Sequence, residues 1–73
     1  MKTYAFLYND KDEKNRLQQY RVEVIASTPR SGYNKLMSIP HLSDKIVPMY
    51  MRFGKDGFQD TDWTSLRKTK NAR

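Results

Sequence analysis

Two segments near the start of the chain alternate between apolar and polar positions, which is the period of a β-strand. In the first, "TYAFLY" (3–8), aromatic residues occupy every second position: Tyr4, Phe6 and Tyr8. The second, "LQQYRVEVIA" (17–26), has an apolar face that carries Tyr20, Val22, Val24 and Ala26. The charged segment 9–16 connects the two, so the pattern predicts an antiparallel hairpin with a long loop.

The next segment changes to helical spacing. Thr28 and Pro29 have the properties of an N-cap and a first helical residue. Three apolar residues follow at i, i+3 and i+4: Tyr33, Leu36 and Met37. Pro40 disfavours helical geometry at the residue before it and predicts the end of the helix. Gly32 weakens the helix by about 1 kcal/mol relative to alanine, so the helix is expected to depend on packing against the sheet.

A third alternating segment, "KIVPMYMRF" (45–53), predicts a third strand. Because proline lacks the N–H that a sheet ladder needs, Pro48 places this strand at a sheet edge, at least around this residue. The "GKDG" sequence at 54–57 predicts a turn, after which Phe58 and Trp63 are expected to hold the chain to the body. Few apolar residues remain from position 64 onward, which predicts one compact domain over 1–63 and a flexible basic tail over 64–73.

This β-β-α-β order predicts a small α+β fold with a mainly antiparallel three-stranded sheet and one helix packed on one face. A right-handed crossover from the second strand to the third leaves the first strand in the middle. The helix is expected to cover the face that carries the aromatic residues of the first strand. The opposite face is expected to be partly open and to carry Leu7, Arg21, Glu23, Ile25, Tyr50 and Arg52.

Charge is distributed unevenly over the 73 residues, whose formal net charge is +6. Residues 1–64 contain ten Lys+Arg and eight Asp+Glu, a net charge of +2. The last nine residues supply the other four cations: Arg67, Lys68, Lys70 and Arg73. The chain has no cysteine and no run approaching the ~18 apolar residues of a membrane span. These features predict a protein of the cytoplasm with no membrane contact.

The inventory of reactive side chains favours no enzymatic chemistry. His41 is the only histidine, and no pattern holds it near a serine nucleophile and an orienting group. Asp10 and Asp12 begin like a calcium-binding loop, but the glycine and the final glutamate of such a loop are missing. The "STPRSG" segment lacks the spacing of a phosphate-binding loop. We therefore expect a non-enzymatic protein without a metal ion or cofactor.

Two kinds of binding remain. The basic tail could contact a phosphate backbone, and Tyr50 near Arg21 and Arg52 could stack on bases, which would make the chain a small DNA- or RNA-binding protein. A protein partner could instead pack on the open face or add a strand to an exposed edge, with Trp63 as an anchor. The protein-binding interpretation is preferred, because the body of the chain is nearly neutral and carries no nucleic-acid-binding motif.

The hairpin "TYAFLY…QYRVEVIA", the capped helix "TPRSGYNKLM", the strand "IVPMYMRF" and the basic end together resemble small transcription regulators of bacteriophages, such as those of Xanthomonas phages. The resemblance implies binding to host RNA polymerase, inhibition of initiation and promotion of antitermination. A monomer in the host cytoplasm is expected, with nucleic acid as a secondary contact. The residues expected to bind the partner are Arg21, Tyr50, Arg52, Trp63, Arg67, Lys68, Lys70 and Arg73.

Overall fold

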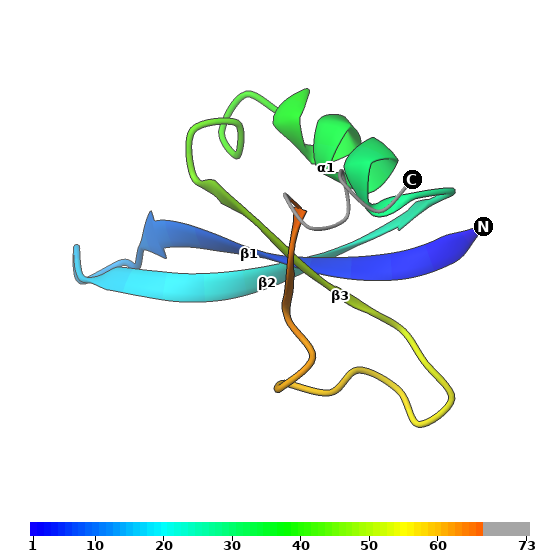
Figure 1. The fold of residues 1–73 in the computed structure, drawn as a ribbon. Coiled ribbons are helices and arrows are strands. Elements are labelled where there is room, and N and C mark those ends of the chain that lie inside the picture. Colours follow the sequence, from blue (N-terminus) through cyan, green and yellow to red (C-terminus); the bar gives the residue numbers. More distant parts are fainter. Residues whose placement is uncertain (67–73) are drawn as a thin grey trace.

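The computed structural model describes residues 1–66, which form four strands and one helix. The elements are β1 (Lys2–Lys11), β2 (Leu17–Ala26), α1 (Pro29–Met37), β3 (Ile46–Arg52) and β4 (Thr64–Ser65). The helix lies over one face of the sheet, and the segment after β3 extends away from it (Figure 1). The α+β class and the predicted order of elements are confirmed, and a fourth short strand follows the predicted three.

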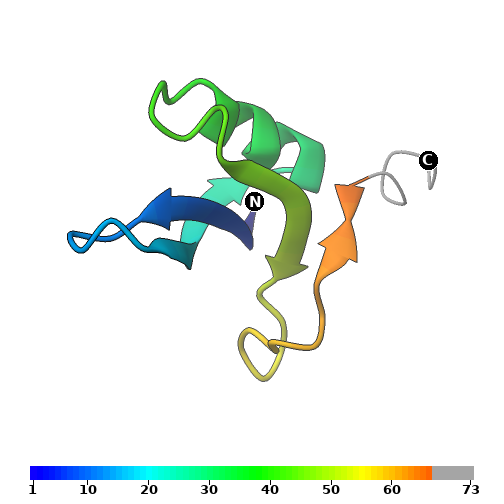
Figure 2. The same ribbon diagram turned by 90° about the vertical axis from the view of Figure 1, so that its left-hand side faces the viewer.

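The four strands form one sheet in the order β2-β1-β3-β4, and every neighbouring pair is antiparallel. β1 is therefore central between β2 and β3, as the sequence predicts. β4 adds to the outer side of β3, where Ser65 pairs with Met49 and Thr64 with Tyr50 (Figure 2).

β4 changes the predicted boundary at residue 64. Thr64 and Ser65 belong to the sheet, and the next residue, Leu66, is only 2% exposed within the core. Burial of a leucine side chain contributes about 2 kcal/mol, which offsets the cost of ordering this short segment. The folded part consequently reaches residue 66, and the predicted tail residues 67–73 lie outside the described residues.

The hairpin loop is shorter than its polar sequence suggests. β1 and β2 pair without interruption from Lys2 opposite Ala26 to Lys11 opposite Leu17, so both strands continue into the charged segment. The Asp12 carboxylate closes the remaining turn by accepting the backbone N–H groups of Lys14 and Arg16, each at 2.9 Å. Asn15 has a φ of 63°, a conformation that asparagine tolerates better than most residues.

The helix begins as predicted. The Thr28 hydroxyl oxygen accepts the Ser31 N–H at 3.1 Å, and Pro29 is the first helical residue. Seven residues form the buried core on the α1 side of the sheet: Tyr4, Phe6, Ala26, Leu36, Leu42, Ile46 and Leu66. The aromatic stripe of β1 therefore faces the helix, as expected.

The predicted faces of β3 are reversed in the structure. Tyr50 lies opposite Phe6, and Arg52 lies opposite Tyr4, so both side chains project on the helix side. Met51 lies opposite Ala5 on the other face, and both residues are fully buried. The prediction that Tyr50 and Arg52 lie on the open face is wrong. β3 has apolar residues at both its even and its odd positions, so its alternation does not show which face is buried.

Pro48 occupies an irregular part of β3. Between the pairs Phe6–Tyr50 and Tyr8–Ile46, β1 advances by two residues while β3 advances by four. A bulge of this kind accommodates a residue that has no N–H to donate. β4 pairs only with Met49 and Tyr50, so it ends before Pro48 and does not pair with that residue. The edge position predicted for this part of the strand agrees with the structure.

Candidate functional site

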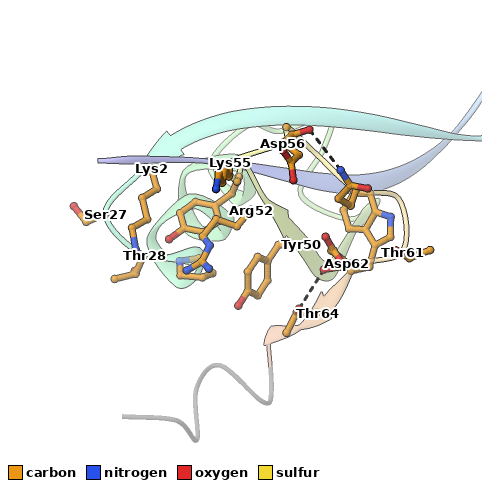
Figure 3. Close-up of a pocket in the computed structure, with 16 residues that line it drawn as sticks. Lys2, Ser27, Thr28, Tyr50, Arg52, Lys55, Asp56, Thr61, Asp62 and Thr64 are labelled. Carbon is orange, nitrogen blue, oxygen red and sulfur yellow. Dashed lines mark hydrogen bonds between the residues drawn. The ribbon is translucent and has the colours of Figure 1, made fainter.

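A groove of about 960 Å³ opens on the helix side of the sheet, beside the N-terminal end of α1. Its walls come from the start of β1, the residues that precede and cap α1, the end of β3, and the segment that returns to β4. The side chains that carry its chemistry are Lys2, Tyr4, Thr28, Tyr50, Arg52, Lys55, Asp56, Asp62, Trp63 and Thr64. In Figure 3, Tyr50 lies in the middle of this groove.

Aromatic packing fixes the position of Tyr50. Its ring meets the Tyr4 ring edge-on with centroids 5.6 Å apart, and it lies 6.1 Å from the Phe6 ring. Burial raises the pKa of the Tyr4 hydroxyl, the nearby Tyr50 raises it further, and Arg52 lowers it in part. Tyr4 therefore stays neutral at physiological pH, and the two tyrosines provide a firm aromatic floor for the groove.

The charged side chains of the groove are divided about Tyr50. Lys2, Arg52 and Lys55 lie on one side of it and Asp62 on the other (Figure 3), and the fifth charged residue, Asp56, follows Lys55 in the chain. Within residues 1–66, no ion pair joins any of these five side chains. The positive side of the groove is thus available to an anionic group of a ligand.

Trp63 reaches the groove through the turn before β4. The Asp62 N–H donates to the Gln59 carbonyl at 2.9 Å, and the Thr64 hydroxyl donates to the Asp62 carbonyl at 3.3 Å. Trp63 itself is half-buried and lines the groove. Three of the predicted partner-binding residues, Tyr50, Arg52 and Trp63, are therefore brought together.

Arg21 does not join them. It projects on the opposite face of the sheet, where its guanidinium lies 3.6 Å from the Glu23 carboxylate and 5.4 Å from the centre of the Phe58 ring. Phe58 in turn packs edge-on against Phe53 at 5.2 Å. Phe58 thus covers part of the face that was expected to be open, and the predicted grouping of Arg21 with Tyr50 is wrong. The other four predicted residues, Arg67, Lys68, Lys70 and Arg73, lie outside the described residues.

Lys2 and Lys55 line the groove but were not among the residues predicted from the sequence. The predicted sheet order could have indicated their position. The start of β1 and the end of β3 lie side by side when these strands are antiparallel neighbours. Lys2 precedes Tyr4 by two residues and Lys55 follows Arg52 by three, so each cation lies near the same end of the sheet. The predicted order of strands therefore contained the information needed to place the cations.

Asp10 and Asp12 of the hairpin are engaged within the protein. Asp10 lies 3.5 Å from the Lys45 ammonium, and the Asp12 carboxylate accepts backbone N–H groups of its own turn. Over positions 1–66, no three Asp, Glu or His side chains gather in a way that would hold a metal ion. In the same part of the chain, no helix has the length and apolar character needed to cross a membrane.

The chain was compared with protein-family models, with curated proteins and with solved structures, and none of them matches it. A half-buried aromatic floor, a positive side and an indole at the rim can bind a complementary surface.

Proposed function

We propose that this protein is a non-enzymatic regulator that binds host RNA polymerase and modulates transcription in the host cytoplasm. The observation that carries the proposal is the convergence of Tyr50, Arg52 and Trp63 on one groove. The resemblance of the sequence to phage transcription regulators supplies the candidate partner. In this proposal the groove is the surface that docks on the polymerase.

The composition of the groove supports a protein partner. Tyrosine, tryptophan and arginine are enriched among the residues that dominate binding energy at protein interfaces. Tyr50 is already held by Tyr4 and Phe6, so its immobilisation on binding costs little side-chain entropy. The cations Lys2, Arg52 and Lys55 complement an acidic patch on the partner and accelerate its association.

The regulatory effect follows from where such a protein docks. A small domain that occupies a surface needed for promoter binding inhibits initiation. The same domain promotes antitermination when it stays bound to the elongating enzyme. We propose inhibition of initiation as the primary effect and antitermination as the second.

Nucleic-acid binding is the second candidate function, and the three cations beside an aromatic ring favour it. Lys2, Arg52 and Lys55 lie near Tyr50, an arrangement in which phosphates pair with cations while a base stacks on an aromatic ring. The formal charge of the groove is nevertheless only +1, because Asp56 and Asp62 also line it. This partial neutralisation makes nucleic acid the less favoured partner.

The experiment that separates the two functions uses the full chain with purified host RNA polymerase and, separately, with single- and double-stranded DNA and RNA. We expect retention of the polymerase at about 0.15 M salt and inhibition of promoter-dependent transcription. Gel shifts of nucleic acid that weaken steeply with salt, without retention of polymerase at any salt concentration, would assign the nucleic-acid function instead.

A further inference from the structure

The outer edge of β2 is the longest unpaired strand edge in the described part of the chain. β2 spans ten residues, contains no proline and pairs with β1 without a bulge. At the other side of the sheet, β4 covers part of β3, and Pro48 interrupts the remainder. Proline, bulges and short strands are the usual protections of a sheet edge, and β2 has none of them.

The backbone groups that point outward from β2 follow from the pairing of β1. The Thr3 carbonyl accepts the Phe53 N–H at 2.9 Å, so the odd-numbered residues of β1 direct their backbone groups toward β3. The even-numbered residues of β1 therefore direct their backbone groups toward β2, where they bond to Val24 and Val22. The backbone N–H and C=O groups of the alternate residues of β2 point away from β1, toward the outer edge: Gln19, Arg21, Glu23 and Ile25. The Lys35 ammonium donates to the Ile25 carbonyl at 2.8 Å, as expected for a carbonyl on the outer edge.

We propose that this edge binds a second copy of the chain, with the two β2 strands antiparallel and the two-fold axis at Val22. In this register Arg21 of each copy lies directly opposite Glu23 of the other. About eight backbone hydrogen bonds form, two for each outward-facing pair. On the helix side, Tyr20 lies opposite Val24 of the second copy, and the two Val22 side chains meet at the axis.

Charge selects this register among the two-fold arrangements. An axis at position 21 would place two arginines directly opposite each other, and an axis at position 23 would place two glutamates opposite each other. Like charges in directly opposed positions destabilise a strand pair, whereas opposite charges contribute about 0.2–1 kcal/mol. The axis at Val22 pairs both arginines with both glutamates, so the surface is complementary to itself, as a two-fold interface requires.

The rest of the fold is compatible with this pairing. A carbonyl oxygen has two lone pairs, so Ile25 can keep Lys35 while it accepts an N–H from the second copy. Tyr20 already stacks on Tyr8 at 5.5 Å and would extend an aromatic and aliphatic stripe across the axis. Tyr50 and Trp63 of the groove come from β3 and the segment before β4, across β1 from this edge. The dimer would therefore present two grooves, in place of the monomer that the sequence analysis expects.

The absence of cysteine makes the test direct. Val22→Cys is expected to form a covalent dimer under mild oxidation. Non-hydrogen-bonded antiparallel pairs bring Cα atoms to about 4.5 Å, which is within the reach of a disulfide. Gln19→Cys is the matched control on the same strand, because the proposed register separates the two copies of this position by about 20 Å. Equal cross-linking at both positions would overturn the proposed register.

Light scattering of the unmodified chain provides the second measurement. We expect the mass to rise with concentration from 8.7 kDa toward twice that value. Arg21→Glu is expected to shift the equilibrium toward the monomer by at least threefold, and the charge-swapped double variant Arg21→Glu/Glu23→Arg is expected to restore it. A mass of 8.7 kDa at every concentration up to about 1 mM would overturn the proposal.

Discussion

Gly32 of α1 lies so close to Val24 of β2 that a Cβ atom on Gly32 would stand 3.0 Å from the Val24 Cγ1 atom. The same Cβ would lie 3.4 Å from the Phe6 ring. Gly32 is buried, and its lack of a side chain allows the helix to approach the sheet at this point. The glycine that weakens the helix in isolation therefore contributes to stability through packing.

Gly32→Ala is the first prediction. The added methyl group improves helix propensity by about 1 kcal/mol, whereas overpacking typically costs 1–3 kcal/mol. We expect the free energy of unfolding to fall by about 1 kcal/mol in urea denaturation.

The control for this prediction is a double-mutant cycle with Val24→Ala, which removes the methyl group that the new Cβ would meet. The double variant is expected to lose less free energy of unfolding than the two single variants lose together. The difference, the coupling energy, is expected to be at least about 0.5 kcal/mol. Strict additivity would contradict the proposed contact between Gly32 and Val24.

Leu66→Ala is the second prediction. Leu66 is 2% exposed in the core, so its truncation is expected to lower the free energy of unfolding by about 2–3 kcal/mol. Ile25→Ala is a suitable control because Ile25 is 58% exposed, and its change is expected to stay within about 0.5 kcal/mol. Chemical denaturation measures both variants. Equal stability of the two would show that Leu66 does not belong to the core.

The third prediction concerns acid. The backbone N–H of Arg16 hydrogen-bonds the Asp12 carboxylate and, together with the Lys14 N–H, holds its pKa below the usual value, although partial burial opposes the shift. The Lys11 N–H lowers the pKa of Asp10 in the same way, with a smaller contribution from Lys45. A carboxyl group with a lowered folded-state pKa stabilises the protein fully above its unfolded pKa of about 4. That contribution disappears as the pH falls through the folded-state pKa.

Asp12→Ala is therefore expected to lower the melting temperature at neutral pH. The difference from the unmodified chain should shrink as the pH falls below about 4 and vanish below the lowered folded-state pKa, where Asp12 is protonated in both states. Circular dichroism melts across this pH range measure the effect, with Asp60→Ala on the exposed segment before β4 as the control. A difference that stays constant down to about pH 2 would contradict the role assigned to the carboxylate.

The local features of this fold were predictable from sequence because short-range chemistry determines them. Thr28 and Pro29 mark the start of α1, and the alternation of β1 identifies the aromatic stripe that faces the core. The central position of β1 also followed from connection rules. These predictions rest on spacing within a few residues or on the handedness of a crossover.

The features that failed depend on long-range register. Nothing local distinguishes the Tyr50 face of β3 from the Met51 face, since both are apolar enough to be buried. Leu66 is a single apolar residue in a polar context, and it reaches the core only because the two residues before it pair with β3. The predicted strand order brings the start of β1 beside the end of β3, but it does not show which face of β3 lines the groove or that the segment before β4 joins it.

The central claim is that the groove containing Tyr50, Arg52 and Trp63 docks on host RNA polymerase. The most direct test compares the affinity of purified polymerase for Arg52→Glu with its affinity for Lys14→Glu. Both side chains are exposed and both changes alter the charge equally, but Lys14 lies in the hairpin loop away from the groove. We predict that Arg52→Glu weakens binding at least about tenfold and that Lys14→Glu changes it less than about twofold. Equal affinities for the two variants, or no binding of polymerase by the unmodified chain, would contradict the proposal.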